Sequence, residues 1–373
     1  MRNFSKLALI ALVASACTSQ NGSKLTGEIT GLTNDTVLVF ANDPVAGQTV
    51  EIDTVPVVDN KFAVTLPDSS VLLLYIIEKP AGNGAMRMAT NPPFLFMPGD
   101  EMKVTGDITD LKASGTEIYD NLATAVNVTA VEEKIKAVGE KLTEAYKNNE
   151  EKVIDSLSNI VQGLYEDLSK EKLEFIKNNP NSLVSGYLYQ GMKSIDGLEA
   201  EKILGDNVKN SALGGFISKI TENYNHQAAI DKASENIKSG KMAPDFKLKN
   251  LNNEEMSLAS FKGKYVLLDF WGTWCGWCIK GIPDMKKYYE KYKDRMEIVG
   301  ICCGDTEEKW RNGVKKHELP WTNLLNEKDN DITTIYAISG YPTKILIDPD
   351  GKIVDVFVGE SEDLYNRLDE LFK

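Results

Sequence analysis

The sequence predicts a C-terminal α/β domain that is preceded by a helical middle region and a small all-β N-terminal domain. Three observations support this fold class. Apolar residues alternate in short runs up to about residue 115, recur every three or four residues up to about residue 240, and then form strand-sized runs next to helical stripes. A chain of 373 residues is also long enough for two or three domains. We therefore predict domains at 24–115, 116–240 and 241–373.

The composition describes a folded acidic protein. Hydrophobic residues make up 42% and charged residues 26% of the chain, which is ordinary for a globular protein. There are 42 Lys and Arg residues against 55 Asp and Glu residues, so the formal net charge is −13. Such a chain repels phosphate backbones, which argues against a nucleic-acid partner. Five cysteines are too few for a disulfide scaffold at this length.

The first residues predict export and attachment to a membrane. Arg2 and Lys6 precede an apolar run over 7–16, which has the length of a signal-peptide core. Ala14-Ser15-Ala16 before Cys17 fits an ordinary secretory cleavage site, and it also resembles a bacterial lipobox, although Ala14 stands where Leu is usual. We favour lipidation of Cys17, because an unpaired thiol is otherwise unexpected in an oxidising compartment. This predicts a signal peptide at 1–16, a lipid tether at 17–23 and a periplasm-facing anchor in the cell envelope.

The N-terminal domain is predicted from short strands separated by turns. Asp59-Asn60 and the segment 97–100 provide turn residues. The predicted strands are Thr36–Phe40, Thr49–Val57, Lys61–Leu66, Val71–Ile77 and Glu101–Gly106. No cluster of reactive side chains lies in this domain, so we expect a docking or spacing role rather than catalysis.

The middle region follows a helical period. Apolar residues recur at three and four from Val153 to Leu168, which predicts a helix packed on its neighbours rather than a membrane or cofactor-binding segment. The segment 178–182 predicts a helix end and a new start. We expect a linker at 238–241.

The last domain carries the reactive residues. An apolar run over 266–271, in which Asp269 is the only charge, leads through a short turn to Cys275-Gly276-Trp277-Cys278 and then to a helical stripe. A thiol at a helix N-terminus faces free N–H groups and the positive end of the helix dipole, so we expect the pKa of Cys275 to lie below that of a free cysteine. Cys278 lies one turn on, where we expect it to be deeper and close enough to form a disulfide.

The segment 269–278, with Pro283 and Gly340-Tyr341-Pro342-Thr343, resembles the thioredoxin superfamily, and most closely the envelope thiol-disulfide oxidoreductases of the TlpA and ResA kind. The resemblance covers about 242–373. It implies a thioredoxin-like fold, a cis-proline at Pro342, and a redox-active disulfide of Cys275 and Cys278 in place of any cofactor. Lipoproteins of that family commonly have a β-rich N-terminal domain of unassigned function. The first domain of this chain resembles it.

Three positions are compared with the family pattern. Trp277 stands where thioredoxins commonly have proline. Gly281 stands where ResA-like proteins carry a buried glutamate. Asp269 matches the buried acid of thioredoxins, six residues before the first cysteine, so we predict that it accepts the proton of Cys278. The alternative for Asp269 is an exposed carboxylate without a role.

A zinc site is the first alternative for the CxxC motif, but it needs a second ligand pair. The candidates are the adjacent Cys302 and Cys303, which point to opposite faces of a strand, and the isolated His226 and His317. We therefore expect no metal. Buried inert thiols are the preferred interpretation of Cys302 and Cys303, with an accessory redox role as the alternative.

Two other functions stay open. A peroxiredoxin-like peroxidase with antioxidant activity would share the fold, but its nucleophile normally follows a Pro-x-x-x-Thr-x-x pattern, and Thr273 lies only two residues before Cys275. A non-catalytic binding lipoprotein could use the fold for docking, although both cysteines are present.

The preferred function is a periplasmic thiol-disulfide oxidoreductase that reduces or exchanges disulfides in envelope proteins. It would receive or pass electrons through a membrane electron-transfer partner. Cys275, Cys278 and Asp269 are its predicted catalytic residues. The predicted substrate-binding residues are Trp274, Gly276, Trp277, Tyr341 and Pro342.

Overall fold

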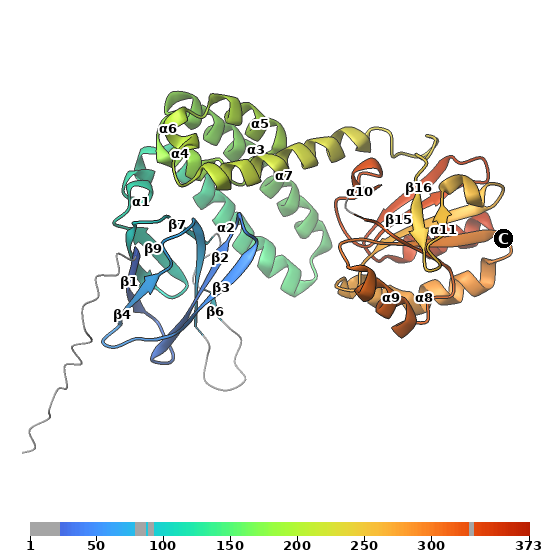
Figure 1. Cartoon of the computed structure of the whole chain (residues 1–373), viewed down its shortest axis with the longest axis horizontal. Helices are drawn as coiled ribbons and strands as arrows, with labels where there is room; N and C mark the ends of the chain where they lie inside the picture. The colour runs from blue at the N-terminus through green and yellow to red at the C-terminus, as the bar shows by residue number, and fades with distance from the viewer. Residues whose placement is uncertain (1–22, 79–86, 89–92, 328–331) are drawn as a thin grey trace, which may run out of the picture. The chain divides into compact units, whose positions relative to one another are not determined.

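The structure is a computed structural model of the chain that describes residues 23–78, 87–88, 93–327 and 332–373 (Figure 1). The predicted signal peptide, Cys17 and most of the predicted tether lie outside these residues. The chain divides into two compact units, Met1–Glu222 and Asn223–Lys373. In the part of the chain that is described, no helix is both long and apolar enough to cross a membrane.

The first unit begins with two β-sheets, as the sequence predicts. One sheet has the strand order β4-β1-β8-β9, and the other has the order β3-β2-β5-β6 with β7 paired to β5. The strands are β1 Ser23–Thr30, β2 Thr36–Asp43, β3 Gln48–Pro56, β4 Lys61–Leu66, β5 Leu72–Glu78, β6 Arg87–Met88, β7 Phe94–Phe96, β8 Glu101–Asp107 and β9 Asp110–Ser114. All five predicted strands are present, and β1, β6, β7 and β9 are additional.

Side chains that alternate along the strands pack into the hydrophobic core of this β domain. Every second residue of β1 is buried, which is the pattern of a strand with one face on the core and one on solvent. Leu25 and Ile29 of β1 lie in the same buried cluster as Val39 of β2 and Leu74 of β5. The two sheets therefore share one hydrophobic core.

Helices fill the rest of the first unit. They are α1 Glu117–Asn121, α2 Val126–Asn148, α3 Glu151–Asn178, α4 Leu183–Leu188, α5 Ser194–Ile203, α6 Asp206–Lys209 and α7 Gly214–Ser234, the last of which extends into the second unit, and the 3-10 turn η1 Leu122–Thr124 follows α1. The predicted apolar stripe lies on α3, and the predicted break at 178–182 separates α3 from α4, whose N-cap is Ser182. Leu168 is buried, whereas Val153 is 42% exposed, so the stripe is fully buried only toward its C-terminal end.

The second unit is a thioredoxin-like domain around a seven-stranded sheet of order β11-β10-β14-β13-β12-β15-β16 (Figure 1). The strands are β10 Leu248–Asn250, β11 Glu255–Met256, β12 Tyr265–Trp271, β13 Met296–Cys302, β14 Thr322–Leu325, β15 Thr343–Ile347 and β16 Ile353–Val358. The helices are α8 Gly276–Tyr292, α9 Glu307–Lys316, α10 Ile332–Ile335 and α11 Glu362–Leu371, with the 3-10 turn η2 Leu258–Phe261. The central strand β12 is parallel to β13 and antiparallel to β15.

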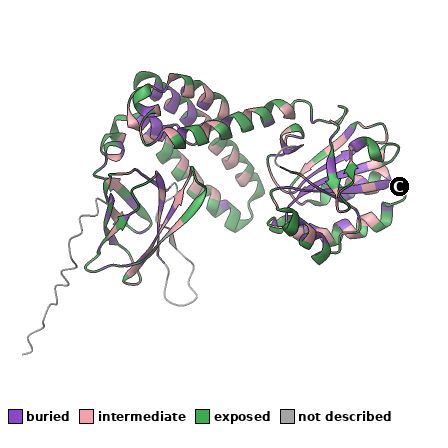
Figure 2. Cartoon of the chain, viewed as in Figure 1, coloured by how far each residue is buried: buried purple, intermediate pink, exposed green. Residues whose placement is uncertain are grey.

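The two faces of this sheet have separate cores, and buried residues are concentrated in its strands (Figure 2). Leu268 and Phe270 of β12 pack with Tyr336 on one face. Leu267 packs on the other face with Met285 of α8 and Leu368 of α11. Because side chains alternate along a strand, Asp269 lies on the same face as Leu267, under α8 and α11.

The predicted linker is part of the second unit. Gly240 N donates to the Ile353 carbonyl at 2.8 Å, and Ile353 N donates to the Lys241 carbonyl at 2.8 Å. Ile237 is buried in the core beneath the sheet. The predicted linker is therefore hydrogen-bonded through its backbone to β16. The division between the two compact units lies earlier in the chain, inside α7. The domain boundary at 240/241 stays a prediction.

Candidate active site

The redox pair lies where the central strand leads into a helix. Strand β12 ends at Trp271, the chain turns, and α8 begins at Gly276 with Cys275 as its N-cap residue. Cys275 and Cys278 form a disulfide, with their Cα atoms 5.3 Å apart. The Cys278 backbone N–H also donates to Cys275 Sγ at 3.1 Å. The sulfur of Cys275 thus takes the place of a capping oxygen at the helix N-terminus.

The two cysteines are equally buried, so the expectation that Cys278 lies deeper than Cys275 is wrong. Cys275 is 6% and Cys278 is 7% exposed. Both lie in an apolar cluster with Trp271 and Trp310, against which Tyr341 also packs. In the disulfide form the two sulfurs are covalently joined within this cluster, so they share one environment.

A carboxylate that the sequence did not reveal fixes the loop before Cys275. Asp305 accepts hydrogen bonds from Thr273 N at 2.7 Å and from Thr273 Oγ1 at 2.8 Å. The Cys302 thiol donates to the same carboxylate at 3.3 Å. Asp305 follows the end of β13, beside the end of the parallel strand β12, which is the edge where functional loops of α/β sheets meet. Asp305 is therefore a positioning residue for the active-site loop.

Exposed aromatic side chains flank the disulfide. Trp274 is 55% and Trp277 is 62% exposed. The Trp274 ring meets Tyr341 edge to face at 5.1 Å, and its Nε1 donates to the Cys303 carbonyl at 3.0 Å. Lys280 Nζ lies 4.6 Å from the centre of the Trp277 ring. Large exposed apolar side chains next to a reactive group are typical of a binding surface.

Gly276 and Pro342 are the other two predicted substrate-binding residues, and one is exposed whereas the other is buried. Gly276 is exposed, and a methyl group added to it would meet no neighbouring atom. Pro342 is buried and is joined to Tyr341 by a cis peptide bond, as the family resemblance implies. Tyr341 therefore connects this proline to the apolar cluster of the two cysteines.

Asp269 is buried, so the alternative of an exposed carboxylate is wrong. The residue is 9% exposed and lies under α8 and α11. Its closest ion-pair partner is Lys344, with Nζ 3.9 Å from Asp269 Oδ1. Burial raises the pKa of Asp269, the positive charge of Lys344 opposes this, and the nearby Glu360 carboxylate adds to it.

Lys344 and Glu360 are the second feature that the sequence did not reveal. Lys344 is 2% exposed and faces Asp269 across the β12–β15 pair. Its Nζ donates to Glu360 Oε2 at 2.8 Å, and the Tyr365 hydroxyl donates to Glu360 Oε1 at 2.7 Å. Lys344 lies opposite Asp269 because of the register in which β12 and β15 pair. That register cannot be read from the sequence, so the sequence carries no signal for this contact.

Cys302 and Cys303 are buried thiols outside the disulfide. Cys302 is fully buried and Cys303 is 2% exposed, and they pack into clusters on different faces of the sheet. Burial, aided by the Asp305 carboxylate, raises the pKa of Cys302 far above its usual range. A neutral thiol is a poor nucleophile, which agrees with the preferred interpretation of inert thiols.

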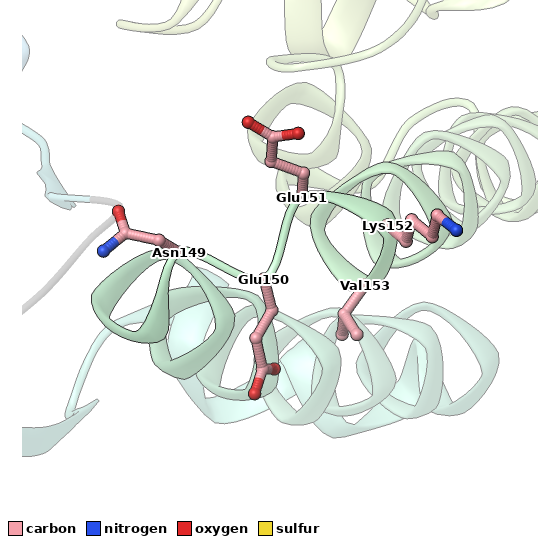
Figure 3. A pocket seen from close by; sticks show the side chains of 5 residues that line it. All are labelled: Asn149, Glu150, Glu151, Lys152 and Val153. Carbon is pink, nitrogen blue, oxygen red and sulfur yellow. The ribbon is translucent and has the colours of Figure 1, made fainter.

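No other site in the described residues offers comparable chemistry. Residues 23–78, 87–88, 93–327 and 332–373 contain no group of three or more His, Cys, Asp or Glu residues that could hold a metal ion. His226 instead pairs with Thr334, with 3.0 Å between Nε2 and Oγ1. A surface hollow at the turn between α2 and α3 is lined by Asn149, Glu150, Glu151, Lys152 and Val153. The side chains of Glu150 and Glu151 point to opposite sides of that turn (Figure 3), so they do not converge on a ligand.

Two parts of the chain match known protein families. Residues 239–356 match the AhpC/TSA family, and residues 23–122 match a domain of unknown function, DUF4369. The thiol-disulfide oxidoreductase ResA of Bacillus cereus is 39% identical over 127 residues, which cover 34% of this chain and 73% of that protein. The ResA protein of Bacillus subtilis is 35% identical over 137 residues, covering 36% of this chain and 76% of that protein.

Among solved structures, the thioredoxin domain of a thiol-disulfide oxidoreductase from Bacteroides vulgatus is 37% identical and has a TM-score of 0.35, covering 36% of this chain and 98% of that chain. The AhpC/TSA match at 239–356 lies within the second unit, which carries the disulfide at the start of α8. Through this unit, the chain belongs to the ResA-like family of thiol-disulfide oxidoreductases.

Proposed function

We propose that this oxidoreductase is a lipid-anchored, periplasm-facing enzyme that uses the dithiol of Cys275 and Cys278 to reduce or exchange disulfides in envelope proteins. The observation that carries the proposal is the disulfide at the N-terminus of α8, bordered by the exposed rings of Trp274 and Trp277. A reactive disulfide beside exposed aromatic rings suits contact with another polypeptide.

The first chemical step belongs to Cys275. Its sulfur at the start of α8 faces the Cys278 N–H and the positive end of the helix dipole, which stabilise a thiolate. The Cys275 thiolate attacks one sulfur of a substrate disulfide. A mixed disulfide forms, the substrate S–S bond breaks, and the other substrate sulfur leaves as a thiolate that takes a proton from water.

The second step belongs to Cys278 and Asp269. The Cys278 thiol passes its proton to Asp269, and the resulting thiolate attacks Cys275 Sγ. The Cys275–Cys278 disulfide forms, the S–S bond between Cys275 and the substrate breaks, and the second substrate sulfur leaves as a thiolate that takes a proton from water. The substrate now carries two thiols, so two electrons have moved from enzyme to substrate. An external dithiol of the membrane electron-transfer partner would restore the reduced enzyme by the reverse exchange.

The substrate surface is proposed to comprise Trp274, Gly276, Trp277, Tyr341 and Pro342. Aromatic rings supply contact area with little loss of side-chain entropy. The open space at Gly276 lets a substrate backbone approach the disulfide closely. We expect substrates to present apolar side chains next to their disulfide.

Reduction of insulin disulfides by the full chain, with dithiothreitol as the electron source, tests this function. The wild-type chain should accelerate insulin precipitation, and the Cys275→Ser variant should not. A peroxidase would instead consume hydrogen peroxide at a rate that depends on Cys275. Peroxide turnover without insulin reduction would replace the proposed function by the peroxidase, and neither activity would favour the docking function.

The anchor is tested by labelling cells with a radioactive fatty acid. The wild-type chain should carry the label and partition into detergent, whereas Cys17→Ala should lose both properties because the acyl group has no attachment site. An unlabelled wild-type protein that stays in the aqueous phase would restore the ordinary secretory interpretation.

A further inference from the structure

A second carboxylate lies against the active-site helix close to Cys278. Gly281 is buried on α8, three residues after Cys278, and therefore lies on the same helix face one turn further on. A methyl group at Gly281 would collide with the carboxylate of Glu360. Glu360 belongs to the segment between β16 and α11, far from α8 in the sequence. The space left by the glycine is thus occupied by an acidic group from another part of the domain.

This carboxylate shares a buried cation with Asp269. Lys344 Nζ is 2.8 Å from Glu360 Oε2 but 3.9 Å from Asp269 Oδ1. The side chains of Lys344, Asp269 and Glu360 are 3%, 12% and 16% exposed, so water screens their charges only weakly. Two carboxylates and one ammonium leave the group one positive charge short of neutrality. Glu360 holds the shorter contact to that ammonium.

Few other charged groups reach Asp269. On α11, Tyr365 donates its hydroxyl to Glu360, and the charges of Asp269 and of Asp284 on α8 both act on Tyr365. Strand β13 places Gly300 opposite Asp269, and β15 places Lys344 there. Lys344 is therefore the cation that decides how strongly Asp269 binds a proton, and Glu360 decides where that cation lies.

We propose that Glu360 is a positioning residue for proton transfer at Cys278. Its carboxylate binds Lys344 Nζ beside α8 and keeps this ammonium from moving closer to Asp269, so that Asp269 stays a strong enough base to take the Cys278 proton. This inference rests on the role proposed above for Asp269. A free Lys344 would move toward Asp269 and stabilise its carboxylate, which would make Asp269 a weaker base.

The test compares variants of opposite expected sign in the full-length chain. In Glu360→Gln, Lys344 loses its main partner, and the titration midpoint of Asp269, followed by carboxyl carbon NMR, should fall by about one unit. In Lys344→Met, the cation is gone and the midpoint should rise. The matched control Glu362→Gln removes an exposed carboxylate two residues away and should leave the midpoint in place.

Gly281→Ala supplies an independent variant, because its methyl group should displace Glu360 and also lower the Asp269 midpoint. Gly139→Ala, at a helical glycine with open space around it, is its control. The pH at which Cys278 begins to resolve a mixed disulfide should move down with the Asp269 midpoint in both Glu360→Gln and Gly281→Ala. A purely structural role would slow resolution without moving that pH.

The role of Glu360 and the oxidoreductase function can each fail without the other. An Asp269 midpoint that is unchanged in Glu360→Gln overturns the role of Glu360, whatever the activity of the enzyme. A wild-type chain that reduces no insulin overturns the proposed function, while the NMR titration can still be read.

Discussion

The Cys278→Ser variant is expected to accumulate a covalent mixed disulfide with its substrate through Cys275. The first thiol can still attack from the start of α8, but the group that would release the substrate is missing. Multiple turnover of insulin should fall by about three orders of magnitude or more, since the nucleophile and the resolving group act as a unit. Non-reducing electrophoresis of the variant from envelope extracts measures the adduct.

Two variants control for this trap. Cys275→Ser should form no adduct, because Cys278 is not the N-cap residue of α8 and lacks the N–H contact that stabilises a thiolate at Cys275. Cys303→Ala should turn over insulin like the wild type, since Cys303 is buried and takes no part in the disulfide. An adduct that persists in Cys275→Ser would assign the attack to a different cysteine.

Asp269→Asn is expected to slow the resolving step about 100-fold near neutral pH. Asparagine keeps the shape of the side chain but cannot accept the Cys278 proton, and a positioned general base contributes about 10²- to 10⁴-fold to such a step. Rapid-quench measurement of the decay of a preformed mixed disulfide isolates this rate. An unchanged decay rate would remove Asp269 from the mechanism.

The same variant should be more stable than the wild type at pH 7. Burial raises the pKa of Asp269 above its value in the unfolded chain, so the folded protein binds more protons in this range and its stability falls as pH rises through the folded-state pKa. Asparagine removes this loss, which is about 1.4 kcal/mol for each unit by which the pKa is raised. Denaturant unfolding from pH 4 to pH 8 should show the gain growing with pH.

The exposed turn residue Asp350 supplies the control for stability. Asp350→Asn should follow the pH dependence of the wild type, because this side chain stays in solvent. Equal stability of Asp269→Asn and the wild type at every pH would mean that Lys344 compensates the buried carboxylate completely.

Local patterns were sufficient to predict the fold class. The strand before the active site, the following helix and the turn at Asp59-Asn60 are all confirmed, and across that turn Lys61 N donates to the Val58 carbonyl at 2.9 Å. Each depends on residues that are neighbours in the sequence, where hydrophobic period and turn residues carry the information. β1 was not predicted, although it shows the regular alternation of a half-buried strand.

The surroundings of the site could not be predicted in the same way. Asp305 meets Thr273 across 32 residues, and Glu360 meets Lys344 across 16 residues. Such contacts depend on sheet register and on where a loop returns, which periodicity does not encode. The equal burial of Cys275 and Cys278 was missed for a related reason, because the cluster that covers them comes from several elements.

The aromatic cluster around the disulfide has a spectroscopic consequence. The chain has five tryptophans, at 271, 274, 277, 310 and 321, and every one belongs to the second unit. Intrinsic tryptophan emission therefore reports on the thioredoxin-like unit alone and cannot register unfolding of the β-sheets in the first unit. A denaturation curve recorded by tryptophan fluorescence describes the second unit, and far-UV circular dichroism, to which both units contribute, is needed to follow the first.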